Sequence, residues 1–244
     1  MIGRYILAAL IAGLLAGLVM GGIQHFILTP LVATAEMFEK QQRATTTTAG
    51  ATKLGCVENT LGGKICEHDH EGGWQPTEGW QRTGLTFLAS MMSGAGFALV
   101  LAGVSFIAGL PITRENGLIW GICGFLAVSL APAAGLAPEL PGMPTADLQL
   151  RQMWWALTVA ATGLGLWLLA AKPAKWAHYA AILFIAVPHI WGAPIALSSD
   201  AQVNPSLAAE FVGKSLAANA IFWALIGTFL AHAFFHLNQK YPQI

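Results

Sequence analysis

Charged residues are scarce in this sequence: Lys, Arg, Asp and Glu together make up 10% of 244 residues, against about 25% in a soluble domain. The 12 basic and 12 acidic residues balance to zero net charge, so no excess of positive charge is available to bind nucleic acid. The sequence also lacks a Gly-rich phosphate loop and a Ser/His/Asp order, so we do not expect an enzyme. Hydrophobic residues make up 55% of the chain, and the mean hydropathy is +0.60. These values predict an integral membrane protein.

Cysteine is equally rare, with three residues in the whole chain. Cys56 and Cys66 lie in one polar segment, where an oxidising periplasm would favour a disulfide between them. The alternative is two free or metal-ligating thiols. Cys123 falls in an apolar stretch and is expected to be a small buried residue.

Six apolar stretches approach the roughly 20 residues that cross a bilayer as a helix. The third is short and rich in Gly and Pro, and the fifth contains Pro188 and Pro194. The sequence therefore predicts an all-α, polytopic membrane helix bundle of five to six transmembrane helices, forming a single membrane domain over residues 1–244. The expected spans are 5–28, 85–110, 117–134, 153–171, 176–197 and 216–235.

The first apolar stretch could be mistaken for a signal peptide, because Arg4 precedes it and Ala-Thr-Ala at 33–35 resembles a cleavage site. Its apolar run is about twice as long as a signal-peptide core, so we expect an uncleaved helix. Gly13, Gly17 and Gly21 recur every four residues, a spacing that lets a neighbouring backbone approach closely. We interpret these glycines as a helix-packing surface.

Basic residues in the short loops predict that both termini are cytoplasmic in a bacterial inner membrane. The cytoplasmic side would then carry Arg4, Arg114, Lys172, Lys175 and Lys240, and the short outer loops only Arg151 and Lys214. This orientation makes residues 29–83 a long extracytoplasmic loop. Within it, Thr45–Thr48 and the neighbouring Ala and Gly residues are typical of a flexible linker.

That loop contains the stretch ICEHDHEGGW at 65–74, in which His68, Asp69 and His70 are flanked by acidic residues at 67 and 71. Imidazole and carboxylate ligands suit divalent metals such as cobalt, nickel and zinc. A loop of this kind could collect metal ions outside the cell. The alternative is a solvated polar loop with no ligand.

Histidines within apolar stretches are costly in lipid and are therefore candidates for function. His25 lies near the outer end of the first span, and His189 is expected midway along the fifth. Pro188 and Pro194 should break that helix and free backbone carbonyls beside His189, as at ion sites of transporters. The alternative is a hydrogen-bonded histidine between helices.

The loop after the third span contains Glu139, Asp147 and Arg151, followed by Trp154 and Trp155 as expected interfacial anchors. Asp147 and Arg151 are four residues apart and could pair at the start of a helix. Glu139 has no basic residue near it in the sequence. It is therefore a further candidate metal ligand.

Four ordered motifs resemble the CbtA family of probable cobalt transporter subunits: TPLVATAEMFE from residue 29, HDHEGGWQPTEGWQRTGLTFLASMMSGAGFAL, PELPGMPTADLQLRQMWWALTVAATGLGL and VPHIWGAP. The resemblance implies uptake of cobalt as substrate, linked to cobalamin biosynthesis, with a small CbtB-like membrane subunit as partner. Glu36, within the first motif, joins the candidate ligands. No organic cofactor is expected, and a homo-oligomer is left open.

Two other functions fit the residues less well. A membrane subunit of a redox complex could hold haem between His178 or His189, on one helix face, and His25, His232 or His236 on another helix. His232 and His236 are four residues apart and could alternatively bind metal or anchor the helix at the interface. A non-transporting membrane scaffold or metal sensor is the third possibility.

Overall fold

The structure is a computed structural model that describes residues 2–49, 57–58, 64–65, 77, 79–196 and 203–240. In chain order its helices are α1 (Ile2–Ile23), the π-helix η1 (Gln24–Leu28), α2 (Thr29–Ala49), α3 (Trp80–Ala108), α4 (Gly117–Phe125), the π-helix η2 (Leu126–Leu130), α5 (Ala131–Ala133), α6 (Leu148–Ala171), α7 (Lys175–Trp191) and α8 (Pro205–Lys240). Two short strands, β1 (Val57–Glu58) and β2 (Lys64–Ile65), pair antiparallel.

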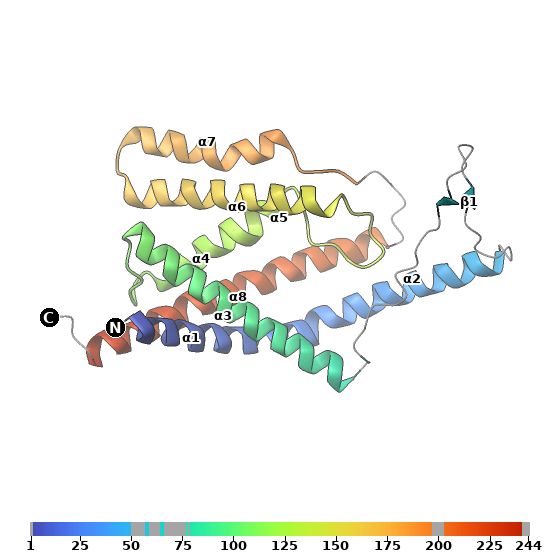
Figure 1. The fold of residues 1–244 in the computed structure, drawn as a ribbon, viewed down its shortest axis with the longest axis horizontal. Coiled ribbons are helices and arrows are strands. Elements are labelled where there is room, and N and C mark those ends of the chain that lie inside the picture. The colour runs from blue at the N-terminus through green and yellow to red at the C-terminus, as the bar shows by residue number, and fades with distance from the viewer. Residues whose placement is uncertain are drawn as a thin grey trace.

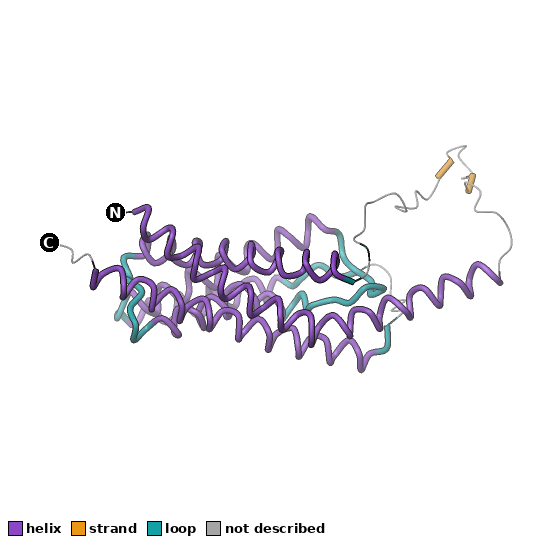
Figure 2. The backbone as a smooth tube through the Cα atoms, turned by 90° about the horizontal axis from the view of Figure 1, so that it is seen from below, coloured by secondary structure: helices purple, strands orange, loops and turns teal. Residues whose placement is uncertain are grey.

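The helices run back and forth along the long axis of an elongated bundle (Figures 1 and 2). Consecutive passes alternate in direction from α1 through α3, the α4–α5 segment, α6 and α7 to α8. The start of α1 and the end of α8 therefore lie at the same end of the bundle (Figure 1). The opposite end, from which α2 projects, is called the α2 end below (Figure 1).

Four helices of the described chain are long and apolar enough to cross a membrane: 2–41, Trp80–Ala108, Leu148–Ala171 and Pro205–Lys240. A shorter apolar helix covers Gly117–Ala133, in agreement with the short third span expected from the sequence. These observations confirm the prediction of a polytopic helical membrane protein. The 17 residues of α7 are at the lower limit for a span.

The first helix differs from the prediction because it does not end near Leu28. It continues through η1 into α2, so residues 29–49 of the expected loop are helical. The prediction of a flexible linker at Thr45–Thr48 is therefore wrong, since α2 includes these residues. Thr is a weaker helix former than Ala, but an established helix propagates at little cost per added residue.

The fifth helix is also less broken than its prolines suggest. Pro188 lies inside α7, near its end, and the helix stops at Trp191. Gly192, with φ of 92°, then turns the chain in a conformation that favours glycine. Pro194 lies beyond the helix rather than within it, so the expected span to Leu197 is too long.

Glycines bring the helix backbones into contact at the centre of the bundle. A Cβ on Gly13 of α1 would overlap the backbone of Gly94 and Ala95 in α3. Gly227 of α8 lies equally close to the backbone of Gly117 in α4. The interpretation of Gly13 as a packing residue is confirmed, and these contacts fix how α1, α3, α4 and α8 surround the buried core.

Three indole groups link the helices of the bundle. Trp154 of α6 is buried, and its Nε1–H donates to the Pro188 carbonyl of α7 at 3.2 Å. Trp155 donates to the Val128 carbonyl of η2 at 3.3 Å, and Trp223 of α8 donates to Ser129 Oγ at 3.3 Å. Trp154 is thus a brace inside the bundle and not the interfacial anchor that the sequence suggested.

Candidate functional site

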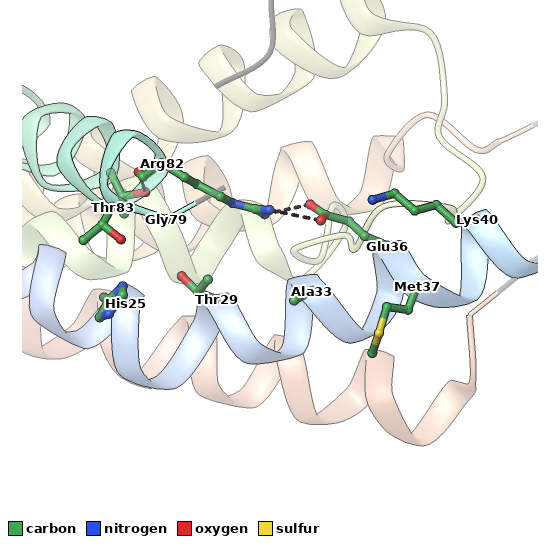
Figure 3. A pocket seen from close by; sticks show the side chains of 10 residues that line it. His25, Thr29, Ala33, Glu36, Met37, Lys40, Gly79, Arg82 and Thr83 are labelled. Atoms are coloured by element: carbon green, nitrogen blue, oxygen red, sulfur yellow. Dashed lines mark hydrogen bonds and ion pairs between the residues drawn. The ribbon is translucent and has the colours of Figure 1, made fainter. Parts of the chain in front are cut away.

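A pocket of about 380 Å³ opens at the α2 end, between the η1–α2 segment and the start of α3 (Figure 3). The antiparallel register that sets Gly21 against Phe87 places His25, one turn further on, near the level of Thr83 and Arg82. We call this pocket the α2–α3 groove. Its lining residues are His25, Thr29, Ala33, Glu36, Met37, Lys40, Gly79, Arg82, Thr83 and Thr86.

Glu36 is held by a bidentate ion pair across the groove. The two guanidinium nitrogens of Arg82 donate to its carboxylate oxygens at 2.7 and 3.1 Å (Figure 3). The side chains of Arg82 and Glu36 are 31% and 28% exposed, so water reaches the pair. The ion pair joins α2 to α3 at a water-accessible position in the groove, where an ion that enters the groove could contact it.

His25 lies in the π-helix η1, at the end of the groove nearest the helix bundle (Figure 3). Its ring contacts Phe26 at 4.9 Å and Phe87 at 6.5 Å between centroids, and within the described residues its imidazole has no hydrogen bond. Gln24 fixes the π-helix, because its side-chain oxygen accepts from Ser90 Oγ at 2.6 Å and its carbonyl accepts from Thr29. Such π-bulges are frequent at functional sites.

His25 and Glu36 share the groove but do not form one coordination sphere. They are eleven residues apart on nearly continuous helix, which corresponds to about 16 Å along the axis. In the part of the chain that the structure describes, no group of three or more His, Cys, Asp or Glu residues is placed to hold a metal ion. The groove therefore offers two separate stations, an inner one at His25 and an outer one at Glu36.

Glu139 is not the unpartnered acid that the sequence suggested. Arg151 Nη2 donates to its carboxylate at 2.7 Å, across the turn that leads into α6. Asp147 does not pair with Arg151, because its side chain caps α6 by accepting from the backbone N–H groups of Gln149 and Leu150 at 3.0 and 3.1 Å. The reason for assigning Glu139 as a metal ligand is therefore removed.

His189 lies in the last turn of α7 and not midway along a span. Its ring contacts the Trp154 ring at 5.9 Å between centroids, and the residue is exposed on the outside of the bundle. The neighbouring Pro188 carbonyl already accepts from Gly192 N–H and from Trp154 Nε1–H. His189 is separate from the α2–α3 groove, and the argument from mid-membrane depth no longer applies to it.

The other predicted loop ligands, His68, Asp69 and His70, lie outside the described residues, as do Cys56 and Cys66. Their assignment stays a prediction. In the sequence, His70 is only nine residues before Gly79, which lines the groove.

The helix arrangement does not favour the haem alternative. α6 lies between α7, with His178 and His189, and the pair α1 and α8 on the other side of the bundle (Figure 1). His178 and His232 contact carbonyl oxygens of their own helices at 3.2 and 3.0 Å. The histidines on α7 therefore do not face a histidine on a neighbouring helix.

Sequence reasoning did not identify Arg82 or Lys40 as part of the site. Lys40 follows Glu36 by one helical turn and lines the same groove. Arg82 falls within the expected loop of residues 29–83, where the sequence offered no partner at a fixed position. The glycine spacing of α1 could have indicated that Arg82 lies near the end of the first helix, because this spacing sets the register of α3 against α1.

Comparison with known proteins supports a single family. The family model described as "Probable cobalt transporter subunit (CbtA)" matches residues 2–235, nearly the whole chain. No curated protein and no solved structure matches.

Proposed function

The chain belongs to the CbtA family of probable cobalt transporter subunits, and from this premise we propose that the α2–α3 groove is where cobalt ions enter the protein. Cobalt is the substrate here, and nickel or zinc would be accepted by the same ligand types. The family function is consistent with a supply of cobalt for cobalamin biosynthesis. We further propose that the chain transports its ion without acting as an enzyme.

One observation carries this proposal: two independently predicted ligands, His25 and Glu36, line the same groove. The groove opens at the α2 end, between α2 and α3. The segment with His68, Asp69 and His70 connects these two helices in the sequence. In this proposal, an ion collected by that segment passes next to Glu36. From there, His25 lies about three helical turns further into the bundle.

The protein sits in a lipid bilayer, and we propose that this is a bacterial inner membrane with the α2 end outside. The charge distribution of the short loops supports cytoplasmic termini. A membrane-impermeant thiol reagent, applied to intact spheroplasts after reduction, should label Cys56 and Cys66. Labelling that requires lysis would show the opposite orientation. A variant without these two cysteines is the control for reaction at Cys123.

We propose that His68, Asp69 and His70 raise the local concentration of cobalt at the mouth of the groove. Replacing all three with alanine should lower uptake of radiolabelled cobalt by roughly tenfold at limiting external metal, the lower end of the effect of a raised local ion concentration. Uptake at saturating metal should be unchanged, because the path itself is intact. Cells without the gene give the background, and nickel is measured alongside. An equal loss at every concentration would contradict a collecting role.

Ion movement needs a driving force that the family match does not specify. A small CbtB-like membrane subunit or the membrane potential would supply it, since a divalent cation moving inward is favoured by a negative interior. A second copy of the chain is an alternative partner. Uptake measured with and without a coexpressed CbtB-like subunit would distinguish a partner-dependent route from an autonomous one.

A further inference from the structure

We propose that Arg82 acts as a lock on the α2–α3 groove: its guanidinium occupies the place on Glu36 that a divalent cation would take, so that ion pairing and metal binding exclude each other. This inference rests on the proposed entry of cobalt at the groove. It goes beyond that function because it assigns to Arg82 the control of when, and by which ions, Glu36 can be bound.

The geometry shows why the two states exclude each other. Arg82 uses both carboxylate oxygens of Glu36, at 2.7 and 3.1 Å. A first-row divalent metal approaches a carboxylate oxygen to about 2.0–2.2 Å, and the guanidinium charge would repel it at that distance. Arg82 therefore competes with a metal ion for Glu36, and full access to both carboxylate oxygens requires Arg82 to withdraw.

The balance of charge in the groove points the same way. Glu36 contributes one negative charge to the lining, whereas Lys40 and Arg82 contribute two positive charges. Among the described residues that line the groove, Glu36 is the acid, and with the ion pair formed its carboxylate is occupied by Arg82. Withdrawal of Arg82 lowers the summed charge of these three residues from +1 to zero and leaves the Glu36 carboxylate without its guanidinium partner.

The position of Arg82 suits a lock better than a rigid structural tie. The α1 and α3 backbones touch at Gly13 and again at Gly17, and beyond α1 the helices α2 and α3 diverge (Figure 1). Arg82 extends from the start of α3 across that opening and ends at Glu36 (Figure 3). Because both side chains are about one-third exposed, the pair is accessible and its net stabilisation is modest. A dication can therefore compete for Glu36.

The test is binding of Co²⁺ alone to the purified full chain in lipid nanodiscs, followed by isothermal titration calorimetry. The His68, Asp69 and His70 alanine background removes metal binding by the loop. Arg82→Gln should tighten Co²⁺ binding by roughly fivefold, the upper end of what a partly exposed ion pair contributes. Arg82→Lys keeps the charge but loses the bidentate geometry, so its gain should be smaller but measurable.

Two comparisons separate a lock on Glu36 from a general effect of charge. In a Glu36→Gln background, Arg82→Gln should give no gain. Arg151→Gln removes a comparable ion pair at the α2 end, one that lies outside the groove, and should change affinity by less than about twofold. An unchanged or weaker affinity of Arg82→Gln, or an equal gain from Arg151→Gln, would overturn the lock.

A second variant and a separate uptake measurement distinguish loss of the lock from loss of folding or of transport. If Arg82→Gln does not purify as a single species, Arg82→Lys decides, and no gain from it overturns the proposal. Uptake by cells is a separate measurement of the proposed function. A chain that shows the binding gain but no cobalt uptake would retain the lock and refute the transport role, and the reverse pattern would refute only the lock.

Discussion

Gly13→Leu is expected to abolish correct assembly of the bundle. A Cβ at this position would overlap the backbone of Gly94 and Ala95, and backbone atoms cannot move aside as a flexible side chain can. Overpacking a core commonly costs about 1–3 kcal/mol, and a clash between two helix backbones is at the severe end of that range. Helices in lipid associate largely through such close packing, so little else would hold α1 against α3. Membrane abundance and the thermal stability of the purified protein measure the effect.

Gly22→Leu is the matched control for this substitution. Gly22 lies on the same helix, but a Cβ there would meet nothing within 4 Å. The added leucine would face outward, where lipid accepts it, so abundance and stability should stay close to those of the parent. If Gly13→Leu behaved like Gly22→Leu, the α1–α3 contact would not have the close geometry that the structure shows.

The helical membrane fold could be predicted because its signal is local. Apolar runs near 20 residues, such as the one that became α3, are readable in any single segment. The glycine repeat of α1 is also local, and its packing role was predicted correctly. Helix ends were less predictable, as α2 shows: polar residues after Leu28 look like a loop, yet they continue a helix that is already formed.

The candidate site was predictable only in part, because pairing depends on residues far apart in the sequence. Glu36 and Arg82 are 46 positions apart, and their contact follows from the position of α2, which was not foreseen. Arg151 was assigned to Asp147 by helical spacing, but Asp147 caps the helix instead and leaves Arg151 to Glu139. His189 was placed at mid-membrane depth because Pro194 was assumed to lie within the helix, whereas α7 ends before it.

The second large effect is expected at His25, the inner station of the groove. Its imidazole is partly buried against Phe26 and Phe87, and within the described residues it donates and accepts no hydrogen bond. A neutral imidazole nitrogen in such a place can serve as a metal ligand, a role that glutamine fills poorly. His25→Gln keeps the size and polarity of the side chain, so the helix should still insert and pack.

His189→Gln is the comparison for this variant. Both substitutions replace a histidine near the α2 end of an apolar helix, but only His25 lines the groove. If cobalt enters through the groove, the two variants should differ strongly. His189 is exposed on the outside of the bundle, where its ring packs against the buried Trp154, and its replacement should leave the path intact.

Uptake of radiolabelled cobalt by cells that express the parent, His25→Gln or His189→Gln at equal membrane abundance therefore tests the entry groove most directly. The groove predicts that His25→Gln lowers cobalt uptake by roughly 10- to 100-fold, the scale on which changes at metal sites act. His189→Gln should retain most of the parental rate. Parental uptake by His25→Gln at equal abundance would contradict the assignment of the α2–α3 groove as the path of the ion.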